Sequence, residues 1–591
     1  MTDRTVLDLY HHEVDAPRAE HYAHWTPDGR RVLSTEEFFA RTCALADAFA
    51  KLGVSSGDRV VLLSDTRPEW HMVDLAILDL GAVDVPVYQT LTPAQLSYQV
   101  NDSGAVAAVA DNATQMAKFL GIRGECPSLR HLVQIEGDRA EGILDFEELS
   151  GSVSDGFEER FWDRAKKIDE MKLATIIYTS GTTGEPKGVM LSHDNLVQNA
   201  TFINRRLFGD RDDLALEFLP LCHIAERIAG YCYMQRSMSK AYCTVETVGG
   251  FFAQVAPTIF LAAPRVYEKV YQKVIEKVEA SSPVKQKLFR WAFEVGVEAN
   301  DCRIAGEVPS LTLRVKHGIA DRLVLTKIRS GLGGRVRLCL TGAAPTPDYV
   351  TEFFHALGVP MAEAYGLTEN APVAVLGDVE PGQVRRGWVG KALDNLEVKL
   401  AHDGEVLVRG PSVMMGYWNK PEQTAETFDA DGFLLTGDIG EMDEDGYLRI
   451  IDRKKELIVT SGGKNVAPQP IESKLKQSHL VDIAVLIGER RNFISALISP
   501  DFEQLQAWAA ENDVESESVE DLLARPQVLE VFQQVVDAVN AELARYEQVR
   551  EFRLLPESLT IENGFLTPTL KVKRRVIDKR FSDIIEGIYS G

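Results

Sequence analysis

Residues 174–188 read ATIIYTSGTTGEPKG, a short apolar run followed by a turn rich in glycine and hydroxyl side chains. The apolar run predicts a buried strand, and the turn begins at the carboxyl end of that strand. In parallel α/β sheets, phosphate-binding loops lie at the carboxyl ends of strands. The stretch therefore predicts an α/β fold with an anion-binding loop at this position.

The sequence before this stretch alternates between helix and strand patterns. Residues 34–37 read STEE, a candidate capping box in front of an apolar helix pattern at 38–53. The patterns that follow are, in chain order, a strand at 57–64, a helix at 68–81, a strand at 82–88, a helix at 93–104 and a strand at 105–111. This βαβ alternation predicts a parallel sheet covered by helices.

The pattern changes between about residues 397 and 451. Short alternating strands and an Asp445-Gly446 turn signal predict antiparallel β structure; the strand patterns are EVLVRG at 405–410, FLLTGD at 433–438 and YLRII at 447–451. The charged segment DRKKEL at 452–457 has no apolar periodicity, which makes it a candidate linker.

The last part of the chain predicts a small α+β domain. It has two strand patterns, at 482–488 and 493–499, then a polar insertion near 501–525 and a basic tail at 571–580. We therefore predict a large α/β unit, a β-rich annex and a small α+β C-terminal domain.

Composition excludes several classes of function. The net charge of −24 over 591 residues argues against general nucleic-acid binding, which needs a basic face. The N-terminus lacks the pattern of a signal peptide, and no run approaches the roughly 20 apolar residues of a membrane span. We expect a cytoplasmic protein whose membrane contact, if it has any, is peripheral. The seven scattered cysteines lack CxxC spacing and predict reduced thiols, mostly in the core.

The turn at 179–188 has the chemistry of a phosphate site. Its glycines let the backbone approach a ligand closely, and its hydroxyls and the Lys187 ammonium are donors to phosphate oxygens. The spacing excludes a Walker A loop, because Pro186 stands where that motif requires glycine. A mobile surface loop is the alternative for such a turn taken alone.

Seven motifs in order resemble the adenylate-forming (ANL) superfamily, which includes acyl-CoA synthetases, luciferases and the adenylation domains of peptide synthetases. The motifs are YTSGTTGEPKGV at 178–189, TGAAP at 341–345, YGLTE at 365–369, GYWNKPEQT at 416–424, TGD at 436–438, DRKKELIVTSGGKNVAP at 452–468 and LTPTLKVKRR at 566–575. The resemblance covers about residues 57–577. It departs from the family at Thr341, where serine is commoner.

The resemblance implies ATP, Mg²⁺ and CoA as ligands and assigns residues to them. The phosphate-binding residues would be Thr179, Ser180, Gly181, Thr182, Thr183 and Gly184, with Lys187 as a catalytic cation. The adenine-binding residues would be Gly342, Ala343, Ala344, Tyr365 and Gly366, followed by Thr368 at the α-phosphate and Glu369 as the Mg²⁺ ligand. Asp438 and Arg453 would bind the ribose, Lys571 would be the catalytic lysine, and Gly462 and Gly463 would line a channel for the pantetheine arm.

The same resemblance implies a chain that works in two conformations. Lys571 would neutralise the α-phosphate and the incoming carboxylate, and would then have to leave so that a thiol can enter. The implied domains are 1–451 for AMP and acyl binding, a hinge at 452–457 with Asp452 as the hinge residue, and a mobile C-terminal domain at 458–591.

Three segments resemble the long-chain fatty acyl-CoA synthetase branch: FLPLCHIAERIAG at 218–230, PTIFLAAPRVYEKVY at 257–271 and GFLTPTLKVKRRVI at 564–577. The implied substrates are a long-chain fatty acid, ATP and CoA, without nucleic acid. His223 could gate the acyl path or be a buried, hydrogen-bonded histidine, and Glu226 and Arg227 could form a local ion pair. Chain length is not readable, because alkyl recognition depends on apolar burial alone.

Other functions stay open at this point. The chain could load an acyl carrier protein in trans, stop at the acyl-adenylate, or be a nucleotide-binding regulator on a degenerate scaffold. The presence of Lys187, Glu369, Asp438 and Lys571 disfavours the regulator. The sequence also leaves open a homodimer and peripheral membrane association.

Overall fold

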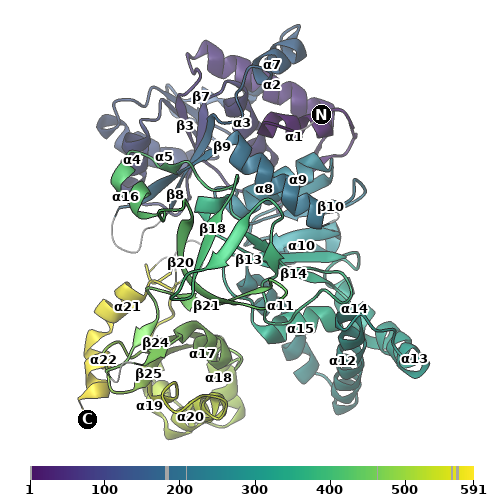
Figure 1. Cartoon of the computed structure of the whole chain (residues 1–591), viewed down its shortest axis with the longest axis vertical. Coiled ribbons are helices and arrows are strands. Elements are labelled where there is room, and N and C mark those ends of the chain that lie inside the picture. The colour runs from purple at the N-terminus through teal and green to yellow at the C-terminus, as the bar shows by residue number, and fades with distance from the viewer. Residues whose placement is uncertain are drawn as a thin grey trace. The chain divides into compact units, whose positions relative to one another are not determined.

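The computed structural model of the chain describes residues 3–179, 185–207, 209–461, 464–560, 563–566 and 572–590. The chain forms two compact units (Figure 1). The first comprises Met1–Leu400, Leu407–Thr436 and Met442–Arg449, and the second comprises Ala401–Val406, Gly437–Glu441 and Ile450–Gly591. The predicted mixed α/β class, with a large N-terminal part and a smaller C-terminal part, is confirmed.

An eight-stranded sheet in the first unit carries the opening stretch. Its order is β19 (Gly416–Tyr417), β9 (Lys187–Ser192), β8 (Leu173–Thr179), β4 (Val83–Pro86), β3 (Arg59–Leu63), β5 (Ala107–Ala110), β6 (His131–Gln134) and β7 (Leu144–Asp145). The strands predicted at 57–64, 82–88, 105–111 and 174–180 are β3, β4, β5 and β8. They pair in parallel, as predicted. β8 continues into the antiparallel strand β9, so the threonine-rich turn connects the two strands of a hairpin.

A nine-stranded sheet forms the second layer of the same unit. Its order is β16 (Lys391–Ala392), β15 (Val375–Leu376), β14 (Met361–Tyr365), β13 (Leu338–Gly342), β12 (Ile259–Ala262), β10 (Leu214–Glu217), β11 (Ser239–Tyr242), β1 (Tyr22–Thr26) and β2 (Gly29–Leu33). Strands β10 to β14 pair in parallel along this order. The adenine-binding motifs predicted at 341–345 and 365–369 follow β13 and β14, at neighbouring strand ends.

Helices cover both sheets (Figure 1). Those of the first unit are α1 (Val6–Val14), α2 (Thr35–Lys51), α3 (Pro68–Asp79), α4 (Pro93–Ser103), α5 (Ala113–Ile122), α6 (Phe146–Gly151), α7 (Phe157–Ala165), α8 (His193–Arg206), α9 (Ile224–Gln235), α10 (Val248–Val255), α11 (Pro264–Glu279), α12 (Pro283–Ile304), α13 (Leu311–Ala320), α14 (Thr326–Ser330), α15 (Asp348–Ala356) and α16 (Pro421–Glu426), with the short turns η1 (Arg123–Glu125), η2 (Asp321–Leu325) and η3 (Thr368–Asn370). Ser34 caps α2 by accepting a hydrogen bond from Glu37 N at 3.0 Å, which is the first half of the predicted capping box.

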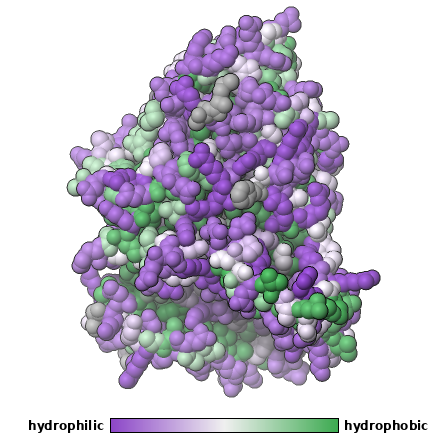
Figure 2. Space-filling view, turned by 45° about the vertical axis from the view of Figure 1, so that its right-hand side comes forward, coloured by the Kyte–Doolittle hydropathy of each residue, from purple (hydrophilic) through white to green (hydrophobic). Residues whose placement is uncertain are grey.

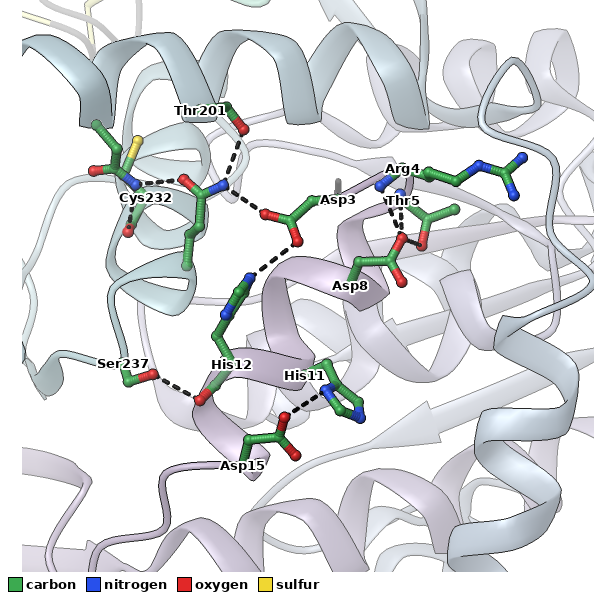
Figure 3. Close-up of polar contacts among 12 residues, drawn as sticks. Asp3, Arg4, Thr5, Asp8, His11, His12, Asp15, Thr201, Cys232 and Ser237 are labelled. Carbon is green, nitrogen blue, oxygen red and sulfur yellow. Dashed lines mark hydrogen bonds and ion pairs between the residues drawn. The ribbon is translucent and has the colours of Figure 1, made fainter. Parts of the chain in front are cut away.

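The N-terminal helix α1 is bound to the end of α9 by hydrogen bonds (Figure 3). Asp3 accepts from Gln235 Nε2 at 2.7 Å and lies 3.0 Å from His12 Nε2, while Ser237 Oγ donates to the carbonyl of His12 at 2.7 Å. The hydrogen bond to Asp3 raises the pKa of His12, although partial burial opposes it. These contacts fix the end of α9, the helix that carries Arg227, whose side chain contacts Thr175 of β8.

The second unit is a small α+β domain with its own core. A three-stranded sheet orders β24 (Val481–Ile487), β25 (Ile494–Pro500) and β26 (Val549–Leu554), beside the hairpin of β22 (Ile458–Val459) and β23 (Asn465–Val466). Its helices are α17 (Pro468–Leu475), α18 (Phe502–Glu511), α19 (Val519–Ala524), α20 (Pro526–Asn540), α21 (Arg574–Arg580) and α22 (Ser582–Tyr589). The polar insertion at 501–525 and the basic tail are therefore largely helical.

A four-stranded sheet contributes residues to both units. Its order is β17 (Glu397–Leu400), β18 (Glu405–Arg409), β20 (Leu434–Met442) and β21 (Leu448–Arg453), which contain the strands predicted in the β-rich annex. Six of the seven cysteines are buried and Cys302 is partly buried, as predicted for core thiols. Within the described ranges, no helix has both the length and the apolar character needed to cross a membrane.

Candidate functional site

The β8–β9 hairpin places Thr179 and Lys187 opposite each other in register. The rest of the phosphate turn, Ser180, Gly181, Thr182, Thr183 and Gly184, lies outside the described residues. At the start of β9 a close approach requires Gly188, because a Cβ there would lie 2.6 Å from Ile176 Cγ2 and 3.3 Å from Trp418 Cβ. The Gly188 carbonyl accepts from Trp418 N at 2.7 Å. This approach brings the motif at 416–424 against the phosphate hairpin.

Lys187, Tyr417 and Glu369 form a line of contacts beside the hairpin. Lys187 Nζ lies 4.7 Å from the centre of the Tyr417 ring, and Tyr417 OH donates to Glu369 Oε1 at 2.9 Å. Burial raises the pKa of Tyr417, and the neighbouring Glu369 carboxylate adds to this, so the hydroxyl stays a donor at neutral pH. The structure thus brings together a cation, an aromatic hydroxyl and the carboxylate predicted to bind Mg²⁺.

The main chain around Glu369 is fixed from two sides. Its carbonyl accepts from Met414 N at 2.8 Å, and Leu367 N donates to Asn370 Oδ1 at 2.6 Å across the turn η3. Thr368 begins η3, directly before Glu369. A carboxylate held in this way matches the single protein carboxylate with which Mg²⁺ is often bound beside phosphate oxygens.

The predicted adenine-binding residues follow two adjacent parallel strands. Gly342 at the end of β13 is the register partner of Ala364 on β14, and a Cβ at Gly342 would lie 2.8 Å from the Ala364 carbonyl. Ala343 has φ of 68° and is exposed together with Ala344. Tyr365 ends β14, and Gly366 has no room for a Cβ, which would lie 1.9 Å from the Pro372 carbonyl. The structure therefore brings both predicted adenine motifs to one edge of the sheet.

Two threonines and a glutamate lie just behind this edge. Thr341 Oγ1 lies 3.0 Å from Thr346 Oγ1, and both side chains are buried. The register partner of Thr341 on β14 is Glu363. Burial raises the pKa of Glu363 to about 8, and the nearby charge of Asp348 adds to the shift. Glu363 is therefore mostly protonated at neutral pH.

The second unit brings together the two residues predicted to bind ribose. Arg453 Nε lies 3.3 Å from Asp438 Oδ1, and Asp438 is buried. The Gly437 carbonyl accepts from Lys454 N at 2.8 Å, and Gly437 N donates to Glu405 Oε1 at 2.9 Å. Strands β18, β20 and β21 thus hold Asp438 and Arg453 as a pair.

The predicted hinge residue, Asp452, is a buried hydrogen-bond acceptor. It accepts from Arg453 N at 2.6 Å and from Gln469 N, in the first turn of α17, at 3.2 Å. Burial raises the pKa of Asp452 to about 6 against these two hydrogen bonds. Two other predictions in this unit, the catalytic Lys571 and the channel glycines Gly462 and Gly463, lie outside the described residues.

The interpretation of Glu226 and Arg227 as a local ion pair is wrong. Arg227 points under β8, where Nη1 donates to Thr175 Oγ1 at 2.8 Å, and Nη2 forms an ion pair with Asp74 and lies 3.1 Å from Asp84 Oδ2. Glu226 instead accepts from Phe218 N at 3.2 Å, and burial raises its pKa. Neighbours on a helix point in different directions, so adjacency in sequence did not place them together.

The Arg227 cluster is fully buried and ties α9 to the strand that leads into the phosphate turn. Asp84 is the register partner of Thr175, and Thr175 Oγ1 donates to the Asp84 carbonyl at 2.8 Å. Tyr231 donates to Asp74 at 2.6 Å and accepts from Arg227 Nε at 2.7 Å. Burial raises the pKa of Asp84. Because Asp84 favours its neutral form, the cluster resembles one ion pair with a neutral acid beside it.

His223 is the N-cap of α9. Its Nδ1 accepts a hydrogen bond from Ala225 N at 3.2 Å, which leaves Nδ1 unprotonated in this conformation. The ring is partly buried, as expected for the hydrogen-bonded alternative, and no role in gating is tested by this contact.

Sequence reasoning missed Tyr417 and Glu363 as candidate functional residues. Tyr417 lies inside the motif at 416–424, so its position was available as a signal, whereas its hydrogen bond to Glu369 depends on pairing between β19 and β9. Glu363 stands two residues before the YGLTE motif, and only burial distinguishes it from a surface glutamate.

Comparisons with known proteins match the whole length of the chain. A family described as "AMP-binding enzyme" matches residues 11–418, and "AMP-binding enzyme C-terminal domain" matches residues 455–591. The chain is 35% identical over 593 residues to the long-chain-fatty-acid–CoA ligase FadD15 of Mycobacterium bovis, covering 100% of this chain and 97% of that protein. It is 33% identical to the peroxisomal long chain acyl-CoA synthetase 7 of Arabidopsis thaliana, covering 91% and 79%.

Among solved structures, the adenylation domain of a carboxylate reductase from Mycobacterium chelonae superposes with a TM-score of 0.75 at 22% identity, covering 99% of this chain and 90% of that one. ATP-bound MatB from Rhodopseudomonas palustris superposes with a TM-score of 0.70 at 23% identity, covering 98% and 99%. Both likenesses concern the fold.

Proposed function

Because the chain belongs to the AMP-binding enzyme family, we propose that it is a long-chain fatty acid–CoA ligase that works in two half reactions. In the first, a carboxylate oxygen of the fatty acid attacks the α-phosphorus of ATP, and the bond to pyrophosphate breaks. In the second, the sulfur of CoA attacks the acyl carbonyl, loses its proton, and displaces AMP. The observation that carries the proposal is the 35% identity, over the full chain, to a protein named for this activity.

The first half reaction gathers negative charge, and the residues near the β8–β9 hairpin suit that problem. A carboxylate and a triphosphate must meet in a crowded anionic transition state, so fixed cations supply most of the stabilisation. Lys187, the first residue of β9, lies over the Tyr417 ring. We assign to it, with the turn hydroxyls from Thr179 to Thr183, the binding of the phosphate oxygens, and to Thr368 a bond to the α-phosphate.

Glu369 is the residue we assign to Mg²⁺. When bound, the metal would supply charge neutralisation at the phosphates. The protein's part is to orient the carboxylate: Tyr417 OH donates to it at 2.9 Å, and the Met414 amide fixes the main chain of Glu369 by donating to its carbonyl at 2.8 Å. A hydroxyl donated to one carboxylate oxygen leaves the other oxygen available.

Nucleoside binding is assigned to two groups of residues. Ala343, Ala344 and Tyr365 would contact the adenine, beside the glycines Gly342 and Gly366 that bring the main chain close. Asp438 and Arg453, already paired at 3.3 Å, would bind the ribose hydroxyls, for which a carboxylate is a suitable double acceptor.

The C-terminal residues are assigned to the exchange between half reactions. Lys571 would neutralise the α-phosphate in adenylation, and Gly462 and Gly463 would line the path of the pantetheine arm. The domain limits at 451 and 458, with Asp452 as the hinge, belong to the same proposal.

The activity is tested by incubating the chain with ATP, Mg²⁺, fatty acids of graded length and CoA. We expect pyrophosphate release with long-chain acids and AMP release that requires CoA. Turnover with an acyl carrier protein but not with CoA would favour the alternative, carrier loading in trans. Absence of both pyrophosphate exchange and AMP release with every acid would contradict an adenylating enzyme.

The role of Lys571 gives the sharpest residue test. Lys571→Ala should slow adenylation by about 10²-fold or more, the scale for loss of a charge-stabilising group, and leave thioester formation from supplied acyl-AMP nearly unchanged. The matched control is Arg575→Ala, an exposed basic residue of the same segment, which should change neither half reaction. An equal loss of both half reactions in Lys571→Ala would refute the assigned role.

A further inference from the structure

The helix α13 exposes an apolar face that its own packing does not explain. Val308 before the helix, Leu311, Val315 and Ile319 along it, and Leu323 in the following η2 are 85%, 75%, 57%, 49% and 43% exposed. The four-residue spacing of Leu311, Val315 and Ile319 places these three along one side of the helix, and Val308 and Leu323 precede and follow them in the chain. We name these five residues the α13 face. Together they form a continuous stripe, in contrast to the isolated apolar residues that normal surfaces carry.

The opposite side of α13 packs against the hydrophobic core of the first unit. Leu313 and Ala320 of α13, with Leu325 of the following η2, are buried and belong to one hydrophobic cluster with Ala292 and Val295 of α12. A helix that packs on its own protein needs one apolar stripe, and the remaining surface is normally polar. The α13 face is therefore a second stripe, turned to solvent.

The segment has the opposite charge to the rest of the chain. Residues 305–335 carry a net charge of +4 in a chain of −24, from Arg314, Lys316, Arg322, Lys327, Arg329 and Arg335 against Glu307 and Asp321. At about 100° per residue, Arg314 and Lys316 fall on either side of the stripe formed by Leu311, Val315 and Ile319. Long basic side chains that flank an apolar stripe can bury their stems while the charges reach a polar headgroup layer.

The position of the segment suits contact with a large flat partner. Figure 1 draws α12, α13 and α14 at one end of the first unit, beyond α15 and the sheets. Figure 2 shows apolar side chains gathered on the corresponding side of the surface, among hydrophilic ones. This arrangement of exposed aliphatic residues between basic residues matches the chemistry of an anionic bilayer, which offers acyl chains below and negative headgroups above.

We propose that the α13 face is a docking surface for anionic phospholipid membranes. Leu311, Val315 and Ile319 would insert at the boundary between headgroups and acyl chains, while Arg314, Lys316 and Arg322 contact phosphates. Positive charge on this segment makes the docking directional, because the chain as a whole carries a net charge of −24. The proposal does not depend on the ligase activity, since docking needs neither ATP nor CoA.

The experiment is co-sedimentation of the full chain, without substrates, with vesicles of phosphatidylcholine alone or mixed with phosphatidylglycerol. We expect binding to the anionic vesicles that weakens as salt is raised, and much weaker binding to neutral ones. The triple variant Leu311→Ser, Val315→Ser, Ile319→Ser should bind at least about tenfold more weakly, because apolar insertion is lost. Lys316→Gln and Arg322→Gln should each cost about fivefold.

The matched control is Leu529→Ser on α20, because Leu529 is 42% exposed in the second unit and should leave vesicle binding unchanged. All the substituted side chains are exposed, and unchanged thermal unfolding of each variant would establish that it is folded. The charge variants keep the apolar stripe and so test the proposal separately.

Equal vesicle binding by the wild-type chain and the triple variant would overturn the proposal. So would a wild-type chain that ignores anionic vesicles. If the triple variant instead shifted a monomer–dimer equilibrium in light scattering, with no effect on vesicles, the face would be a contact between two copies and the membrane assignment would be wrong. Ligase activity is measured separately with a soluble acyl substrate, so failure here is distinguishable from failure of the proposed function.

Discussion

The two units hold their most buried arginines in different ways. In the first unit, Arg227 forms an ion pair with Asp74 and also contacts Asp84 beneath β8, and all three side chains are completely buried. In the second, Arg574 makes two hydrogen bonds of 2.7 Å to Glu472, and the two side chains keep 19% and 12% of their surface exposed. If Arg574 were removed, water could hydrogen-bond to Glu472 in its place. Water cannot reach the fully buried partners of Arg227 in the same way. The strand leading into the phosphate turn is therefore much more firmly fixed than the core of the C-terminal unit.

The largest expected effect tests this difference directly. Arg227→Met should destabilise the first unit by about 3–5 kcal/mol, because it removes the cation that neutralises the fully buried Asp74 carboxylate and leaves the Tyr231 hydroxyl as its donor. Arg574→Met should cost the second unit only about 1–2 kcal/mol, since Glu472 can be hydrated. Hydrogen exchange of the amides in β8 should rise by about 10²-fold or more in the first variant, and that of β24 by about tenfold in the second.

Each variant serves as the control for the other unit, whose exchange should not change. The comparison fails if the two substitutions have equal local effects. It also fails if Arg574→Met is the more damaging substitution. In that case the partial exposure of Arg574 and Glu472 to water would not reduce the cost of losing their ion pair.

Much of the fold could be predicted from local hydrophobic patterns in the sequence. The βαβ patterns at 57–111 predicted β3 to β5 and the intervening helices, because hydrophobic periodicity is a local signal. The helices α18 and α19 were missed as elements, because polar residues outnumber apolar ones across 501–525 as a whole and hide the apolar side chains that anchor each helix, such as Leu505 and Leu522. The resemblance to the adenylate-forming superfamily is confirmed by the families that match residues 11–418 and 455–591.

The candidate site was predictable as motifs but not as contacts. Seven motifs named Lys187, Glu369, Asp438 and Arg453, and the structure pairs Asp438 with Arg453 and joins Lys187 to Glu369 through Tyr417. Those contacts depend on which strands become neighbours, and pairing between distant strands leaves no mark on a single sequence. The mistaken pairing of Glu226 with Arg227 has the same cause.

A smaller effect is expected from removing the Tyr417 hydroxyl, which donates to Glu369, the proposed metal ligand in the first unit. Tyr417→Phe keeps the ring that contacts Lys187 but removes the hydroxyl that orients Glu369. Loss of such a supporting hydrogen bond typically weakens metal binding by tenfold or more, so the Mg²⁺ concentration for half-maximal pyrophosphate exchange should rise by about tenfold. The maximal rate at saturating Mg²⁺ should change much less.

The control for this change is Tyr447→Phe, which removes a hydrogen bond of similar length, 2.8 Å to the Gln383 carbonyl, elsewhere in the first unit. It should leave the Mg²⁺ dependence as it is. An unaltered Mg²⁺ dependence in Tyr417→Phe would mean that Glu369 is oriented by its main chain alone, or that it does not bind the metal.

The smallest expected effect concerns Glu363, the partly buried acid behind the adenine-binding edge. Its folded-state pKa of about 8 lies above the ordinary glutamate value, so between about pH 4.5 and 8 the folded chain holds a proton that the unfolded chain releases. Stability from this group therefore falls as pH rises across that range and is constant above it. Glu363→Gln does not titrate, so its melting temperature relative to wild type should rise between pH 5 and pH 8, by a few degrees.

Other titrating groups of the chain, such as Asp452 with its pKa of about 6, contribute to both proteins and cancel in that difference. Glu503→Gln, at an exposed position of α18, should show no such change with pH. A constant difference between Glu363→Gln and wild type from pH 5 to pH 8 would show that Glu363 ionises as an ordinary surface acid. In that case the sheet edge is open to water, and the contrast between a dry first unit and a partly hydrated second unit would hold only beneath β8.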